Sequence, residues 1–122
     1  MFFQSMLKQL YTRESLRSTD DGFRFELKNR LLAAKLTGVR RVAVDGHDVS
    51  LAGAELVTGD GRALTPDEVS AATPVEFDLG ETFEVRIRGE RLEVGKHEIV
   101  VEFDAVPFGG LKLEVEDVIA GA

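Results

Sequence analysis

The chain has 122 residues, a net charge of −7 and no cysteine. This length predicts a single domain that can bury its own core. The lack of cysteine excludes disulfides, cysteine-ligated metals and a thiol nucleophile, and it favours a cytoplasmic location. The acidic balance disfavours nucleic acid and anionic membrane surfaces as partners. No apolar run reaches the roughly 20 residues of a membrane-spanning helix, so no membrane contact is expected.

Residues 1–13 predict an N-terminal arm or short helix, because large apolar side chains recur there at helical spacings. These side chains are Phe2, Phe3, Met6, Leu7, Leu10 and Tyr11. They can cap one end of the chain's own core or form a surface for a partner, since exposed apolar patches mark interfaces. Residues 14–122 are expected to form a single β-sandwich domain.

Alternation of apolar and charged residues predicts strands that are buried on one face and solvated on the other. The clearest alternation, in residues 82–103, predicts a hairpin with Phe83 and Val101 in the core. Further strands are expected at residues 15–19, 23–30, 39–44, 54–58 and 111–116, and residues 31–36 are expected to be a connection. The pattern predicts an all-β fold, an antiparallel β-sandwich of about seven to nine short strands with one short helix.

Turn residues separate these strands. Asp45 and Gly46 form a dipeptide that is typical of a tight hairpin. Residues 59–61 read as a glycine-containing turn rather than a calcium loop, because the alternating acidic ligands of such a loop are absent. Thr65, Pro66 and Glu68 predict the start of the short helix, with Thr65 as its cap.

The sequence offers no nucleophile–base pair, phosphate-binding loop or metal-ligand cluster. His47 follows a turn and is expected to be solvated or to bridge that turn. His97 is expected to be half-buried and hydrogen-bonded, with catalysis or metal ligation as its alternative role. Acidic residues on the solvated strand faces are expected to form cross-strand ion pairs. No catalytic, cofactor-binding or metal-binding residue is therefore predicted in this chain.

Three groups of residues carry a resemblance through their order and spacing. They are Val44-Asp45-Gly46, then residues 64–69, then Gly89, Leu92, Gly95, Lys96, His97, Glu98 and Val100. With residues 14–119 as a whole, they resemble the small β subunit of the C-glycoside deglycosidases and its uncharacterised relatives.

The resemblance implies a hetero-oligomeric enzyme in which this chain is the non-catalytic β-sandwich subunit. A larger barrel-type α subunit would carry the catalytic residues and a divalent metal, Mn²⁺, while this chain would hold no cofactor. The implied reaction is that of a carbon–carbon lyase, which separates the sugar of a 3-oxo C-glycoside, such as a flavonoid C-glycoside, from its aglycone.

Two alternatives stay open. The chain could be an accessory sandwich subunit of another sugar-metabolising barrel enzyme. It could also be a stand-alone carbohydrate-binding module, although one tyrosine and no tryptophan leave few aromatic platforms for a sugar.

The candidate partner interface combines the apolar residues of the N-terminal arm with Val106, Pro107 and Phe108. Phe108 lies on a connection, where function is commonly placed. It is expected to contact the partner, to plug the core or to be exposed at the tip of the loop.

Overall fold

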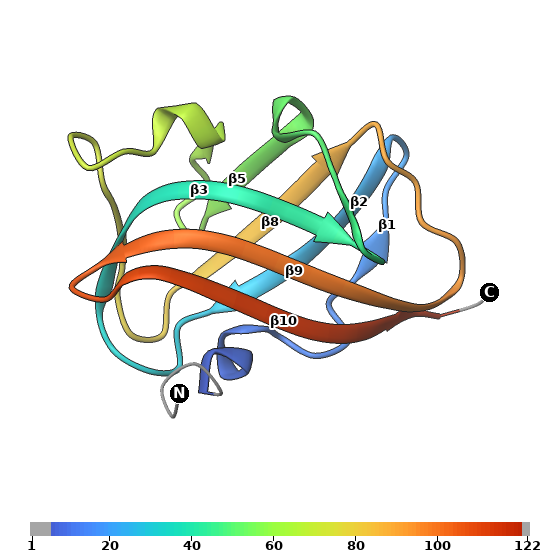
Figure 1. The fold of residues 1–122 in the computed structure, drawn as a ribbon, viewed down its shortest axis with the longest axis horizontal. Coiled ribbons are helices and arrows are strands. Elements are labelled where there is room, and N and C mark those ends of the chain that lie inside the picture. Colours follow the sequence, from blue (N-terminus) through green and yellow to red (C-terminus); the bar gives the residue numbers. More distant parts are fainter. Residues whose placement is uncertain (1–5, 121–122) are drawn as a thin grey trace.

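A computed structural model describes residues 6–120 and shows two antiparallel sheets packed face to face (Figure 1). The rear sheet has the order β1 (Arg17–Ser18), β2 (Gly22–Lys28), β8 (Thr82–Arg88), β5 (Ala54–Thr58) and β6 (Ala63–Leu64). The front sheet has the order β10 (Gly109–Ile119), β9 (Gly95–Val106), β3 (Ala34–Val44) and β4 (His47–Asp48), and β7 (Val75–Phe77) pairs with β3. The predicted all-β antiparallel sandwich is confirmed.

Helical structure in the described residues consists of three short 3₁₀ segments, η1 (Leu7–Leu10), η2 (Leu51–Gly53) and η3 (Pro66–Glu68). The segment η3 lies where the short helix was expected. The Glu68 carboxylate accepts a hydrogen bond from the backbone N–H of Thr65, at 2.8 Å. In residues 6–120, no helix has the length and apolar character that crossing a membrane requires.

The predicted hairpin in residues 82–103 is wrong in its pairing, although its inward-facing residues are right. Phe83 and Val101 are both buried, but β8 pairs with β2 and β5 whereas β9 pairs with β3 and β10. Residues 89–94 carry the chain from the rear sheet to the front sheet, and glycines with positive φ, Gly89 at 92° and Gly95 at 130°, bound this crossover loop. Alternation reports which side of a strand is buried, and it carries no information about the neighbouring strand.

Residues 31–36 are not simply a connection, because β3 already begins at Ala34 and pairs there with β7 and β9. Three strands, β3, β9 and β10, have 11 or 12 residues and are longer than expected. The turn at Asp45 and Gly46 has the expected positive φ values of 52° and 88°, which suit a tight hairpin.

Aromatic and aliphatic side chains from both sheets fill the space between them. Phe77 of the front sheet stacks on Phe83 of the rear sheet, with ring centroids 4.2 Å apart. A cavity of about 50 Å³ with an apolar lining lies beside this pair. The surface of this lining is almost entirely apolar and gives water few hydrogen-bond partners, so this cavity belongs to the core.

Candidate functional site

The β9–β10 hairpin and the loop from β2 to β3 lie at the left end of the sandwich in Figure 1. One buried asparagine, Asn29, organises this loop. The Asn29 side chain donates to the carbonyl oxygens of Leu32 at 2.7 Å and of Phe77 at 2.6 Å, and it accepts from the backbone N–H of Leu31 at 3.0 Å. The Asn29 carbonyl also accepts from Gly80 N–H at 2.7 Å. Asn29 therefore fixes residues 29–32 against the turn at residues 78–81.

These segments present apolar side chains to solvent at the same end. Leu32 is 55% exposed, Leu79 is 63% exposed, and Val106 of the neighbouring hairpin is 47% exposed. Pro107 is exposed as well, and a shallow groove between Leu31, Leu32 and Phe108 continues this surface. We call Leu31, Leu32, Leu79, Val106, Pro107 and Phe108 the apolar end. Exposed apolar side chains gathered in this way are typical of interaction surfaces.

The candidate interface residues fall into three groups. Phe2 and Phe3 lie outside the described residues. Leu7, Leu10 and Tyr11 are buried in the chain's own core, and Met6 is half-buried. Val106 and Pro107 are exposed, whereas Phe108 is half-buried and packs against the core from its loop. The described part of the N-terminal arm therefore contributes mainly to the core, and the apolar surface lies at the hairpin and the Asn29 loop.

A second buried polar residue ties this arm to the last strand. Asp117 accepts a hydrogen bond from the Tyr11 hydroxyl at 2.6 Å and from the backbone N–H groups of Glu14, Leu16 and Val118. Burial alone would raise the pKa of Asp117, but these hydrogen bonds outweigh it and the pKa is lowered. Burial and the bond to Asp117 raise the pKa of Tyr11. The pair is fully satisfied, which indicates a structural role.

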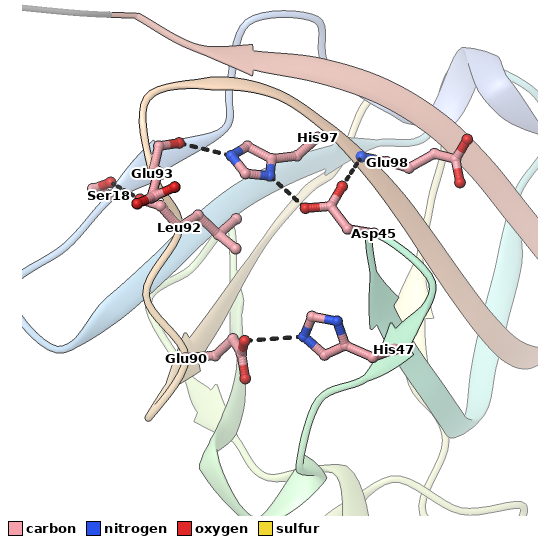
Figure 2. A network of polar contacts seen from close by, with 8 residues as sticks. All are labelled: Ser18, Asp45, His47, Glu90, Leu92, Glu93, His97 and Glu98. Carbon is pink, nitrogen blue, oxygen red and sulfur yellow. Dashed lines mark hydrogen bonds and ion pairs between the residues drawn. The ribbon is translucent and has the colours of Figure 1, made fainter.

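The opposite end of the sandwich holds both histidines, and each contacts the crossover loop (Figure 2). His97 Nδ1 lies 2.7 Å from Asp45 Oδ2, and His97 Nε2 lies 2.7 Å from the Glu93 carbonyl oxygen. Asp45 Oδ1 accepts a hydrogen bond from Glu98 N–H at 2.9 Å. His47 Nε2 lies 3.0 Å from Glu90 Oε2. We call Asp45, His47, Glu90, Glu93 and His97 the histidine network.

The geometry around His97 favours its doubly protonated form. A carboxylate and a carbonyl oxygen can only accept hydrogen bonds, so both ring nitrogens must donate. Burial alone would lower the pKa of His97, but the hydrogen bonds to Glu93 and Asp45 outweigh it and the pKa is raised. The pKa of Asp45 is lowered, mainly by the hydrogen bond from the backbone N–H of Glu98 and to a smaller extent by the hydrogen bond from His97. An imidazolium with both nitrogens engaged has no free lone pair, so it cannot accept a proton from a substrate.

The positions of the two histidines agree with the sequence-based expectations. The His47 side chain is 56% exposed beside the turn, and the His97 side chain is 11% exposed and hydrogen-bonded. Among the described residues, no group of three or more His, Asp or Glu side chains could hold a metal ion.

The ion pairs on the solvated faces are partly cross-strand. Glu102 pairs with Arg41 and Glu116 with Lys96 across strands, whereas Glu84 pairs with Arg86 along one strand. The Lys112–Glu114 pair also lies along one strand.

The fold defines a β-sandwich domain. The Tyr11–Asp117 pair and the histidine network both have a structural role in it. Residues 6–120 match the family model described as the N-terminal domain of hydroxymethylglutaryl-CoA reductase, and the chain belongs to this family. No curated protein matches the chain.

This match overturns the resemblance to the C-glycoside deglycosidase β subunits, because the matching family is a different one and spans nearly the whole chain. The quoted turns, caps and strand signatures are common to many β-sandwiches, so their order alone did not identify the family. The family match does not support the description of this chain as a lyase or as a C-glycoside deglycosidase subunit. The carbon–carbon cleavage reaction, the barrel-type α subunit and its Mn²⁺ stay untested predictions.

Proposed function

We propose that this chain is a non-catalytic accessory unit that docks through its apolar end onto a separate catalytic unit. The observation that carries this proposal is the exposure of Leu32, Leu79 and Val106 at one end of the sandwich. The buried core of a protein interface is more apolar than the rest of the protein surface and is depleted of charged residues. Asn29 supports the docking role, because it fixes two of the contributing segments in advance and so lowers the entropic cost of binding.

The family description suggests the partner. A chain that corresponds to an N-terminal domain over residues 6–120 is expected to act beside the part of the enzyme that performs the reaction. We therefore propose the catalytic unit of a hydroxymethylglutaryl-CoA reductase as the docking partner, with both proteins in the cytoplasm. In this proposal the substrate and cofactor sites belong to the partner.

The proposal is tested by titrating the purified chain into the purified reductase catalytic unit of the same organism and measuring heat. We expect saturable binding that weakens at least about tenfold for Leu32→Asp and for Val106→Asp, because a buried unpaired carboxylate costs more than the roughly 1.4 kcal/mol of a tenfold change. Val94→Asp is the matched control, since Val94 is 65% exposed on the crossover loop. Docking through the apolar end would be refuted if Val94→Asp abolished binding while Leu32→Asp and Val106→Asp left it intact.

A further inference from the structure

The outer face of the rear sheet carries a row of arginines across three strands. Arg17 of β1 lies directly opposite Arg24 of β2, and Arg24 lies directly opposite Arg86 of β8. Arg88 follows two residues after Arg86, on the same face of β8. Like charges directly opposite each other destabilise a sheet, so this row of arginines lowers the stability of the folded chain.

The positive charge of one arginine in this row, Arg86, is compensated by carboxylates. Arg86 Nε lies 2.5 Å from Glu84 Oε2, and Glu55 of β5 is the register partner of Arg86 on its other side. Within residues 6–120, the side chains of Arg17, Arg24 and Arg88 form no ion pair or hydrogen bond. The chain has 22 acidic residues, yet these three neighbouring guanidinium groups are left available to another anion.

A shallow depression of about 620 Å³ lies beside these groups. This volume falls within the range of about 300 to 1,000 Å³ that is common for small-molecule sites. The depression is lined by Thr19, Asp21, Arg24, Glu55, Glu84, Arg86, Ile87 and Arg88.

The carboxylates in this lining already have partners nearby. Glu84 bonds to Arg86, Glu55 lies opposite Arg86, and Asp21 accepts a hydrogen bond from the Thr19 hydroxyl at 3.3 Å. The lining therefore holds equal numbers of carboxylates and guanidinium groups, but only Glu84 and Arg86 form an ion pair with each other. Arg24 and Arg88 are the two guanidinium groups of the lining that have no carboxylate within ion-pair distance among the described residues. These two residues are diagonal neighbours in the register, a relation that places side chains on the order of 7 to 8 Å apart. A single oxyanion between them is within reach of both guanidinium groups.

We propose that Arg24 and Arg88, flanked by Arg17, bind the oxyanion group of a small molecule, which is a carboxylate or a phosphate. Guanidinium groups bind both kinds of oxyanion through paired, charge-assisted hydrogen bonds. This site lies on the outer sheet face, so it does not depend on the docking role of the apolar end.

The experiment is a titration of the ¹⁵N-labelled chain with inorganic pyrophosphate and, separately, with malonate, followed by NMR. We expect saturable shifts at Arg17, Arg24 and Arg88, and an increase in Kd of about tenfold for Arg24→Gln or Arg88→Gln, as expected for loss of a charge-assisted hydrogen bond. The control is Arg40→Gln, because Arg40 belongs to the other sheet and pairs with Asp104 at 3.3 Å. The spectrum of each variant reports whether it is folded.

Tighter binding of pyrophosphate would identify a phosphate as the ligand group, and tighter binding of malonate would identify a carboxylate. The proposal is overturned if neither probe gives saturable shifts at the row, or if both bind Arg24→Gln and Arg88→Gln as well as the unsubstituted chain. Binding of an acidic peptide when neither small probe binds would also overturn it, in favour of a protein partner.

Discussion

Asn29 shows how one side chain can shape a surface that it does not itself occupy. It is 2% exposed, and its amide serves backbone groups of Leu31, Leu32 and Phe77. Buried backbone groups that lose their partner cannot turn to water, so they pay a desolvation penalty. The position of Leu32 at the apolar end therefore depends on Asn29.

Replacing Asn29 with alanine should lower the free energy of unfolding by on the order of 3 kcal/mol, because two carbonyls and one N–H lose their buried partner. Urea unfolding measures this change. Gln9→Ala is the control, since Gln9 is an exposed amide and should change stability by less than about 0.5 kcal/mol. A loss of the same small size for Asn29→Ala would show that the three hydrogen bonds do not hold the apolar end.

The sequence did not reveal Asn29, because an asparagine between Lys28 and Arg30 resembles any surface position at the end of a strand. Its burial results from a turn some 50 residues later in the chain folding over it. The two histidines were easier to place, since each follows or precedes a recognisable turn or strand. The bonds that connect them to the crossover loop required knowledge of the sheet topology.

At the scale of elements, the crossover loop is one of the connections that hold the two sheets together. It joins β8 of one sheet to β9 of the other, and the histidine network fixes it to the β3–β4 turn. Leu92 of this loop is half-buried against the core. Release of the loop would therefore uncover this end of the sandwich.

The stability that His97 contributes should depend on pH. Its pKa is raised in the folded chain, so the contribution is fully present below the unfolded value of about 6.5 and is lost as the pH rises through the folded value. We expect His97→Gln to destabilise the chain more at about pH 5.5 than at about pH 8.5. Urea unfolding at both pH values measures this difference.

The control for this measurement is His47→Gln, because the His47 side chain is 56% exposed and its contact with Glu90 is open to solvent. It should change stability little at either pH. A loss for His97→Gln that is equal at both pH values would indicate that the imidazole acts only through its shape.

The strands themselves could be read from the sequence, because burial on alternate residues is a local pattern. Phe83, Val85 and Ile87 face the core as expected. Strand neighbours could not be read in the same way, since β2 and β8 are more than 50 residues apart in the chain and no local signal links them. The predicted hairpin failed for this reason.

Phe83→Ala tests the core on which both sheets depend. Phe83 is 2% exposed and stacks on Phe77 of the opposite sheet, so its truncation should cost about 3 to 5 kcal/mol. Chemical unfolding measures this cost, and Thr82→Ala serves as the neighbouring control because Thr82 is only half-buried. A cost below about 1 kcal/mol would mean that the inward and outward faces of β8 are exchanged.

At the scale of the whole molecule, the sandwich separates three surfaces. The apolar end, the histidine network and the arginine row lie on different parts of the described chain. The all-β class and the Val106–Phe108 loop as a candidate interface could be read from the sequence. Leu32 and Leu79 could not, because Leu32 stands in the unbroken apolar run of residues 31–34 and Leu79 stands alone in a turn, so neither shows the alternation that separates exposed from buried positions.

The most direct test of the docking account is hydrogen–deuterium exchange on the chain, alone and mixed with the reductase catalytic unit. The account predicts slower exchange in the complex at residues 29–33, 78–81 and 106–110, and unchanged exchange in the crossover loop at residues 89–94. Unchanged exchange at all three segments, or protection confined to the crossover loop, would contradict the claim that the apolar end is the docking surface.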